Sequence, residues 1–386
     1  MKILITTDFY KHNLGGITTS IFALCAGLRT QGHEVRILTL SDHDVSYREG
    51  DDYFIRSVAA YYAPGMRVSF AFHDPLIKEL IDWRPDIIHA QSEATTLTMA
   101  MKIRKRCGAP LLMTCHTDYA YYVFGKAKDV PVIKALAKVV GAVFYRSADR
   151  IVVPSKKALS FPFLSKVKDR LVVIPNGIEL KKYCQILYPN EKKELRCTLG
   201  IPDNARILIC ASRLSKEKNI GELISFLPPL LEKVPQALLL IVGEGPERKH
   251  LEKQAERLHI KDHVIFAGRI PFEDMWRYYA ISDIFVSASV FELHSMSYLE
   301  AMAEGLPLLC REDEALDGVL EAGKNGLIYQ DRESFLKHAE KLLTDSKFRK
   351  QMRAGSAEKA ETFSSDDFAR SVLSLYETVI TTDKDS

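Results

Sequence analysis

The chain lacks the features that stabilise small secreted domains. Its seven cysteines are scattered singly among 386 residues and never stand as a Cys-x-x-Cys pair, which argues against a disulfide framework and against a zinc site. Apolar runs such as 171–175 and 238–242 have the length of a strand, far below the roughly 18 residues of a membrane span. Residues 1–5 read as a core strand and not as a signal peptide. We therefore expect a cytoplasmic protein without a metal.

The whole chain has no strong excess of either charge, because 53 Lys and Arg stand against 50 Asp and Glu, a formal net charge of +3. We therefore predict no nucleic-acid partner. One stretch departs from this balance. Residues 101–183 hold 17 Lys and Arg against 5 Asp and Glu, a local net charge of +12. This excess suggests a face that seeks an anionic surface, and peripheral binding to the inner face of the cell membrane is one interpretation.

Short apolar strands alternate with helical patterns in both halves of the chain. The clearest strand-helix-strand series are 2–7, 18–31 and 34–40, and then 206–211, 221–233 and 237–242. This alternation predicts an α/β fold class with two Rossmann-like, doubly wound domains. We place the first domain at 1–180 and the second at 181–364, and expect a C-terminal helix at about 365–386 to pack back on the first domain. The polar stretch 188–194 is the predicted linker.

Residues just after a strand have the strongest claim to function in such sheets. Gly15 and Gly16 follow the first strand and would let backbone N–H groups approach an anion, although a simple turn is the alternative. No G-x-G-x-x-G motif supports a dinucleotide cofactor. Arg213 and Lys218 follow the first strand of the second half. Two cations there suit a diphosphate leaving group without a metal, with a solvated basic loop as the alternative.

Two carboxylates, with seven residues between them, flank a predicted helix start. Glu292 lies in a polar turn after a strand, and Glu300 lies in a short helix that stops at Gly305. The helix N-terminus between them would offer N–H groups to phosphate. Solvated surface charge is the common alternative for such pairs, but the apolar sequence around Glu300 disfavours it.

Eight short motifs occur in order along nearly the whole chain. They are Gly15-Gly16, Thr114-Cys115-His116-Thr117, Val153-Pro154-Ser155, Ile174-Pro175-Asn176-Gly177-Ile178, Arg213 with Lys218, Val242-Gly243-Glu244-Gly245-Pro246, Gly268, and Glu292 with Glu300. Each motif is weak alone. Together they make the chain resemble the retaining glycosyltransferases of family 4 type, whose GT-B fold has two Rossmann-like domains facing each other across a cleft.

The resemblance implies a role for each motif residue. Arg213 and Lys218 would hold the donor diphosphate, Glu300 the ribose hydroxyls and Glu292 the transferred sugar, while His116 would line the sugar site. The catalytic set would be His116, Arg213, Lys218 and Glu292. The residues that bind substrate would be Gly15, Gly16, Arg213, Lys218, Gly243, Arg269, Glu292, His294, Ser295, Met296, Ser297 and Glu300.

Two of these positions depart from the family pattern. Ser295 stands where the family usually carries a glycine, which puts the approach of backbone to phosphate in question. His294 is similarly unusual and would either touch the sugar or be satisfied by its neighbours. The mechanism that the resemblance implies is a front-face substitution in which the departing diphosphate oxygen takes the acceptor proton, with a UDP-sugar as substrate and no cofactor.

A looser resemblance links the chain to bacterial 1,2-diacylglycerol 3-glucosyltransferases. It rests on 314–320, on 323–326 and on the tyrosine-rich 119–122. Residues 132–146 can form a helix with one apolar face and with basic side chains opposite, a pattern that suits anionic lipid as well as packing on a sheet. A polysaccharide or soluble acceptor, a GT-B sugar epimerase and a non-catalytic sugar-nucleotide-binding protein stay open as alternatives to a lipid hexosyltransferase.

Overall fold

The computed structural model describes residues 1–10, 15–60, 67–117 and 143–384. The chain divides into two compact units. Unit 1 comprises Met1–Gly177 together with Ser365–Ser386, and unit 2 comprises Ile178–Ser364. Each unit has a sheet of its own, mostly parallel in unit 1 and wholly parallel in unit 2. Within the described ranges, no helix is both long enough and apolar enough to cross a membrane.

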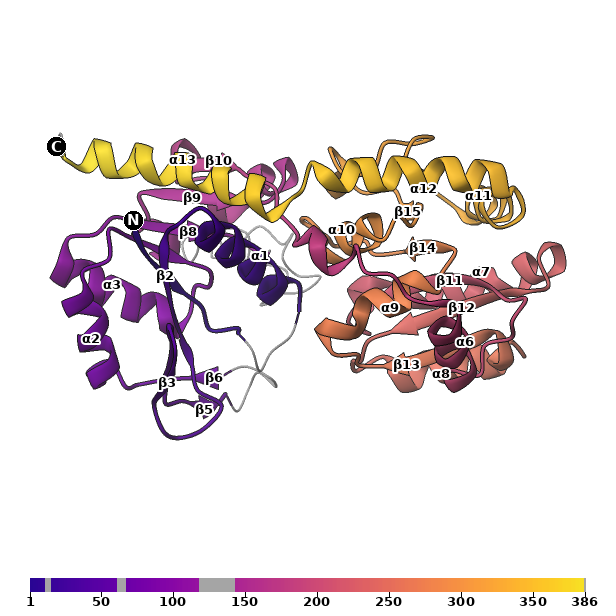
Figure 1. The fold of residues 1–386 in the computed structure, drawn as a ribbon, viewed down its shortest axis with the longest axis horizontal. Coiled ribbons are helices and arrows are strands. Elements are labelled where there is room, and N and C mark those ends of the chain that lie inside the picture. Colours follow the sequence, from indigo (N-terminus) through magenta and orange to yellow (C-terminus); the bar gives the residue numbers. More distant parts are fainter. Residues whose placement is uncertain (11–14, 61–66, 118–142, 385–386) are drawn as a thin grey trace. The chain divides into compact units, whose positions relative to one another are not determined.

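Unit 1 is built on an eight-stranded sheet with the order β10-β9-β8-β7-β1-β2-β4-β3 (Figure 1). Neighbouring strands are parallel except for the β3–β4 pair. The inner strands are short apolar runs that are buried on both faces, as parallel strands covered by helices require. The strands are β1 (Lys2–Thr6), β2 (Glu34–Leu40), β3 (Tyr47–Glu49), β4 (Asp52–Ile55), β7 (Ile87–Ala90), β8 (Leu111–Thr114), β9 (Arg150–Val153) and β10 (Leu171–Val173), with β5 (Val58–Ala59) and β6 (Arg67–Val68) in a separate pair.

The C-terminal helix α13 (Ser365–Lys384) belongs to unit 1 and packs along α1 (Gly16–Thr30) (Figure 1). The two backbones approach so closely that a Cβ at Gly27 would lie 2.2 Å from the carbonyl oxygen of Ser365. Glycine at position 27 therefore sets this close packing. The other helical elements of the unit are α2 (Pro75–Trp83), α3 (Thr95–Cys107), η2 (Lys156–Ser160), η3 (Pro162–Leu164) and η4 (Lys168–Arg170).

Unit 2 has a six-stranded sheet with the order β13-β12-β11-β14-β15-β16, all parallel. Numbered within the unit, this order is 3-2-1-4-5-6, which is that of the Rossmann fold. Alternate residues of its strands face opposite sides, so that Ile207 and Ile209 enter one core cluster and Leu208 enters the other. The strands are β11 (Arg206–Ala211), β12 (Ala237–Val242), β13 (Val264–Gly268), β14 (Ile284–Ser287), β15 (Leu308–Arg311) and β16 (Gly326–Tyr329).

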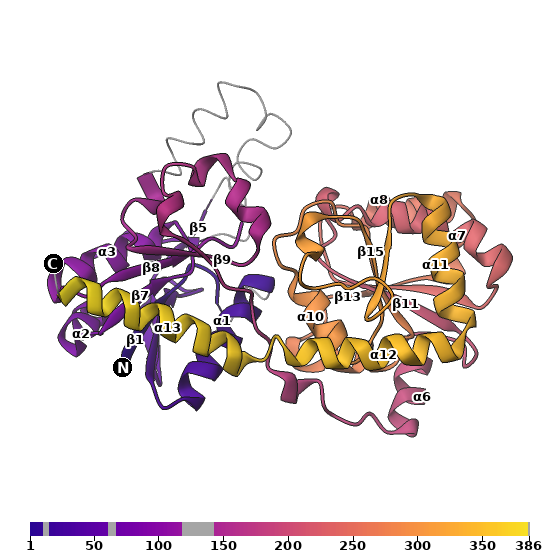
Figure 2. The same cartoon turned by 90° about the horizontal axis from the view of Figure 1, so that it is seen from above.

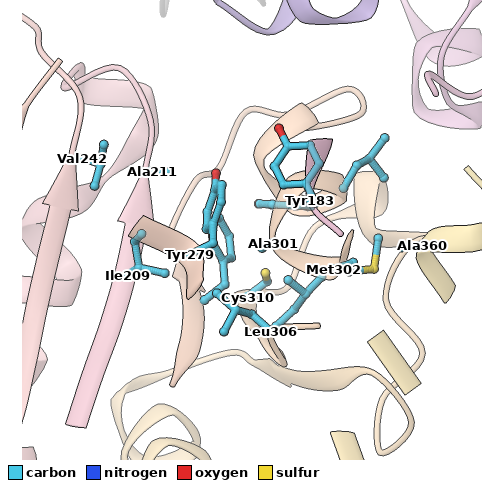
Figure 3. Close-up of a cluster of buried hydrophobic side chains, with 14 of the residues drawn as sticks. Tyr183, Ile209, Ala211, Val242, Tyr279, Ala301, Met302, Leu306, Cys310 and Ala360 are labelled. Atoms are coloured by element: carbon cyan, nitrogen blue, oxygen red, sulfur yellow. The ribbon is translucent and has the colours of Figure 1, made fainter. Parts of the chain in front are cut away.

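Helices cover both faces of the unit 2 sheet. One face packs against α7 (Ile220–Lys233), α8 (Arg248–Arg257) and α11 (Arg332–Thr344), and α7 and α11 lie side by side at the right of Figure 2. The other face packs against α9 (Met275–Ala280) and α10 (Met296–Ala303), where Figure 3 shows Tyr183 and Tyr279 with their phenolic oxygens directed away from Leu306. The remaining helical elements are α6 (Pro189–Thr198), α12 (Ser346–Glu361), η5 (Leu180–Lys182), η6 (Lys216–Lys218), η7 (Lys261–His263), η8 (Phe272–Asp274) and η9 (Glu314–Leu316).

The predicted linker at 188–194 is wrong, because most of it forms helix α6 within unit 2. Pro189 occupies the first helical turn, and the Glu191 carboxylate accepts a hydrogen bond from the backbone N–H of Tyr188 at 2.9 Å. Both are helix-start signals. The predicted tyrosine-rich stretch 119–122 lies outside the described residues, as does all of the predicted 132–146 helix except its last four residues.

Candidate functional site

The candidate donor residues of unit 2 follow strands β11 and β14. These two strands are neighbours in the sheet, although the chain forms β12 and β13 between them. Strands β12 and β13 are added on one side of β11, and β14 to β16 on the other. The strand order therefore reverses at β11. Ligands of open α/β sheets bind outside the carboxyl ends of the strands at such a switch point. Arg213 and Lys218 follow β11, whereas Glu292 follows β14.

The loop after β11 holds Arg213 exposed to solvent. It packs directly on the loop after β12, where Gly243 has a φ of +136° and a Cβ would lie 2.0 Å from the carbonyl oxygen of Ser212. A Cβ at Gly245 would lie 2.2 Å from the carbonyl oxygen of Leu214. No side chain fits at either position without movement of the backbone. The structure therefore explains Gly243, predicted to bind substrate, by the packing of two loops.

The Lys218 ammonium donates a hydrogen bond to the Glu292 carboxylate, with 2.5 Å between Nζ and Oε1. Both side chains are largely shielded, at 21% and 11% exposure. The two loops are also joined through their backbones, because the N–H of Val290 donates to the carbonyl of Glu217 at 3.2 Å. The structure thus brings together two residues that the sequence analysis assigned to the diphosphate and to the sugar.

A polar network supports the turn that carries Lys218. Asn219 adopts the left-handed conformation with a φ of +49°, and its amide donates to Glu222 Oε2 at 3.0 Å. Arg311 donates to both carboxylate oxygens of Glu222, at 2.7 and 2.8 Å, and the Tyr329 hydroxyl donates to the same group at 3.1 Å. Side chains from α7, β15 and β16 therefore hold the backbone just after Lys218. None of these supporting residues was predicted from the sequence.

Glu300 lies inside helix α10 and is buried, with 8% of the residue exposed. The hydroxyl of Tyr279, from α9, donates to Glu300 Oε2 at 2.7 Å. Burial raises the pKa of Glu300 from 4.5 to about 6, and the hydrogen bond from Tyr279 opposes that rise. A carboxylate with one oxygen already bonded to protein keeps Oε1 as an acceptor for a ligand hydroxyl.

The four residues before and at the start of α10 differ in exposure. His294 is buried, its ring lies 5.5 Å from that of Phe363, and burial lowers its pKa to about 4. Met296 is buried in the hydrophobic cluster, so its side chain serves the core. Ser295 and Ser297 are half-buried and hydrogen bond to each other through their hydroxyls at 3.0 Å. The first N–H groups of any helix have no partner within it, which leaves the start of α10 suited to an anion.

Arg269, predicted to bind substrate, follows β13 and is exposed. The residue before it, Gly268, has a φ of +76° and accepts a hydrogen bond from the N–H of Gly243 at 2.8 Å through its carbonyl. The loops after β11, β12 and β13 are therefore bound to one another in series. Their backbones, more than their side chains, position this edge of unit 2.

Three predicted residues belong to unit 1 instead. His116 follows β8 and is half-buried; its Nε2 lies 2.8 Å from the Oε1 of the buried Gln91, which follows β7. Burial lowers the pKa of His116 to about 4, so the imidazole is neutral at pH 7. Gly15 and Gly16 begin α1, and a Cβ at Gly15 would meet no atom within 4 Å. Gln91 is a neighbour that the sequence analysis missed, although its place after a buried strand was a usable signal.

In the described ranges, no three His, Cys, Asp or Glu side chains lie together in an arrangement that could hold a metal ion. Asp42 and Asp44 form an Asp-x-Asp pair just after β2 in unit 1. These two carboxylates do not belong to any group of three possible ligands in the described ranges.

Comparisons with known proteins match both halves of the chain. Residues 14–182 match the family described as Glycosyltransferase Family 4, and residues 191–359 match the family described as Glycosyl transferases group 1. The chain is 32% identical over 331 residues to the alpha-monoglucosyldiacylglycerol synthase of Streptococcus pneumoniae, and this alignment covers 85% of this chain and 75% of that protein. The Acholeplasma laidlawii protein of the same name is 27% identical over 349 residues, covering 88% and 87%.

A solved structure supports the same relationship at the level of the fold. Anabaena HepE in complex with UDP and glucose aligns with 98% of this chain and with all of its own chain, at a TM-score of 0.76 and 19% sequence identity.

Proposed function

The chain belongs to the GT-B glycosyltransferases of family 4 type, and on that premise we propose that it is a retaining hexosyltransferase that moves glucose from UDP-glucose to diacylglycerol. It carries the two-part architecture of that family, and the predicted GT-B fold is confirmed. The observation that carries the proposal is the pairing of Lys218 with Glu292 at the switch point of unit 2, beside Arg213. A cation and a carboxylate in contact there can serve the two ends of the bond that breaks.

In the proposed reaction the donor diphosphate binds at the loop after β11. Arg213 takes phosphate oxygens with its planar guanidinium, and Lys218 adds a point charge where negative charge grows as the bond breaks. Glu292 accepts hydrogen bonds from hydroxyls of the sugar, and Glu300 accepts them from the ribose. The first turn of α10 donates N–H groups to the phosphates.

The chemistry we propose is a front-face substitution. The bond between the anomeric carbon and the diphosphate oxygen breaks, and a bond from the acceptor oxygen forms on the same face of the sugar. The proton of the acceptor hydroxyl moves to the departing diphosphate oxygen. Glu292 is not a nucleophile in this scheme, because a hydrolase pair of carboxylates flanks one bond, whereas Glu292 and Glu300 serve sugar and ribose.

We assign the acceptor to unit 1, at His116 and Gln91. The Nε2–H of the neutral imidazole donates to the amide oxygen of Gln91, which fixes the ring and leaves Nδ1 to accept a hydrogen bond from a hydroxyl. A lipid acceptor is favoured by the synthase names of the two relatives. UDP as the donor base is favoured by the UDP bound in the structural neighbour, whose likeness to this chain is one of fold.

We further propose that unit 1 rests on an anionic membrane. The segment that follows β9 exposes three lysines, Lys156, Lys166 and Lys168, which we call the lysine triple. Leu159 and Phe144 are exposed in the same basic stretch, at 37% and 38%. Each basic side chain near an anionic surface contributes roughly 1 kcal/mol, and exposed apolar side chains can enter the interface.

One assay tests the proposed reaction. UDP-glucose, UDP-galactose and GDP-mannose are each incubated with diacylglycerol in mixed micelles, with a soluble glucan and with no acceptor, and products are identified by mass spectrometry and NMR. We expect an α-linked glucosyl lipid from UDP-glucose, and full activity in a chelator. A β-linked product would refute retention. Rescue by manganese after loss in the chelator would refute metal independence, and an altered sugar nucleotide without acceptor would indicate an epimerase.

Sedimentation with vesicles tests the membrane proposal. We expect the parent protein to bind vesicles of phosphatidylglycerol at low salt and to dissociate as salt screens the charges. Replacing the lysine triple with glutamates should abolish binding. The matched control replaces three exposed lysines of unit 2, Lys337, Lys347 and Lys350, with glutamates. Equal loss in both variants would show that net charge alone matters and would leave no role for this face.

A further inference from the structure

The contact between Tyr279 and Glu300 joins two buried side chains from neighbouring helices. Tyr279 is fully buried on α9, and its hydroxyl lies 2.7 Å from Glu300 Oε2 on α10. The phenol has a fixed direction, because its ring packs 6.4 Å from Phe285 and 6.5 Å from Tyr183 between ring centres. Figure 3 shows Tyr279 held among Ile209 and the other side chains of the cluster.

We propose that Tyr279 is a positioning residue for donor binding, because its hydroxyl holds Oε2 of Glu300 and so presents Oε1 to the ribose hydroxyls. The inference rests on the proposed function, in which Glu300 binds the ribose. A phenol donates well to a carboxylate and poorly to a protonated carboxyl. The contact therefore fixes the orientation of Glu300 and also favours its ionised, hydrogen-bond-accepting form.

The surroundings of Glu300 make this second effect necessary. Burial raises the pKa of the Glu300 carboxyl to about 6, and Tyr279 supplies the hydrogen bond that opposes the rise. The other titratable groups of this cluster are the phenols of Tyr183 and Tyr298 and the thiol of Cys310, with the thiol of Cys210 and the carboxyl of Glu304 beside them, and burial raises the pKa of each. None of these five is a cation, so they offer Glu300 no charge compensation at neutral pH.

Tyr183 supplies a matched control. It is a buried tyrosine of the same cluster, with 5% of the residue exposed. Its phenol interacts with Glu300 electrostatically, without a hydrogen bond between the two in the described structure. Tyr183→Phe and Tyr279→Phe each remove one hydroxyl from one buried ring. Only Tyr279→Phe removes a hydrogen bond to Glu300.

The experiment is calorimetric titration of UDP into the full chain at several pH values from 6 to 9. Loss of a hydrogen bond to a carboxylate should raise its proton affinity about tenfold. We therefore expect Tyr279→Phe to bind UDP about fivefold more weakly than the parent at pH 6 and within about twofold of it above pH 8. Dividing the Kd of each variant by that of the parent at the same pH removes the effect of the ionisation of UDP itself. Tyr183→Phe should give a ratio that does not vary with pH.

A second variant, expected to strengthen UDP binding instead of weakening it, covers the case in which Tyr279→Phe fails to fold. Difluorotyrosine at position 279 is a stronger donor of the same shape, so UDP binding at pH 6 should become tighter. A ratio of about one at every pH for Tyr279→Phe, or the same loss of UDP binding in Tyr183→Phe, would overturn the inference. Glu300→Gln separates it from the proposed function: if that variant binds UDP like the parent, the ribose role of Glu300 itself fails.

Discussion

Replacing Glu300 with glutamine should stabilise unit 2 against unfolding in a way that depends on pH. Burial raises the pKa of Glu300 from 4.5 to about 6 in the folded protein. A carboxyl with a raised folded pKa contributes its full share of stability below the unfolded pKa, and that share is lost as pH rises through the folded pKa. The ionised carboxylate should therefore cost about 2 kcal/mol of folding free energy at pH 8.

The comparison between two pH values isolates this effect. From the same two pKa values, the cost is about 0.8 kcal/mol at pH 5, so the gain from Glu300→Gln should grow by about 1 kcal/mol between pH 5 and pH 8. Any cost of packing the amide is equal at both pH values. For a unit of this size the difference corresponds to about 2–5 °C in Tm. Thermal unfolding followed by circular dichroism at pH 5 and pH 8 measures it.

Glu321→Gln is the matched control for this prediction. Glu321 is exposed, and hydrogen bonds from Lys359 and Lys324 lower its pKa. A carboxyl whose pKa is lowered in the folded protein has the opposite effect: its contribution to stability is present at higher pH and is lost on acidification. This variant should therefore gain no stability between pH 5 and pH 8. If Glu300→Gln behaves in the same way, the buried carboxylate does not impose the cost that its burial implies.

Three further predictions concern single positions. Arg213→Ala and Lys218→Ala should each lower kcat about a hundredfold, or by about 3 kcal/mol, with an unchanged fold by circular dichroism; normal turnover in both would remove the leaving-group role. Gly243→Ala should lower Tm by much more than Gly200→Ala, because both have positive φ but only Gly243 has a carbonyl where the Cβ would lie. Gln91→Glu should raise the pKa of His116 well above 4, because a carboxylate beside the imidazole favours its protonated form. NMR titration measures this pKa. An unchanged value would show that the two side chains do not stay in contact.

The sequence predicted the strands and the strand-end loops well because parallel strands buried on both faces read as unbroken apolar runs. The bounds of Arg206–Ala211 and Ala237–Val242 were predicted without error. The prediction of a linker at 188–194 is wrong for a specific reason. The stretch is as polar as a linker, but Pro189 and Glu191 are helix-start signals and they, not the composition, decide its structure.

The supporting contacts of the site could not be read from the sequence. Glu222 and Arg311 are 89 residues apart, and His116 and Gln91 are 25 apart. Nothing in local periodicity pairs residues across strands, because the order of the sheet decides which strand ends meet. The resemblance supplied Glu292 and Glu300 as a motif, but their partners Lys218 and Tyr279 became visible only with the fold.

The ion pair between Lys218 and Glu292 leads to a last prediction about the donor-free site. Lys218 is proposed to bind the diphosphate, yet in this structure its ammonium is held by Glu292 at 2.5 Å. Glu292→Gln removes the negative charge that competes with a diphosphate for Lys218. An ion pair of this exposure is worth up to about 1 kcal/mol, so UDP, which lacks the sugar, should bind up to about fivefold more tightly. Turnover of UDP-glucose should fall, because the amide accepts sugar hydroxyls less strongly than a carboxylate. Calorimetry with UDP and steady-state kinetics on the same preparation measure both effects. Weaker UDP binding in Glu292→Gln would mean that the carboxylate serves the diphosphate site by holding Lys218 in place, and not the sugar.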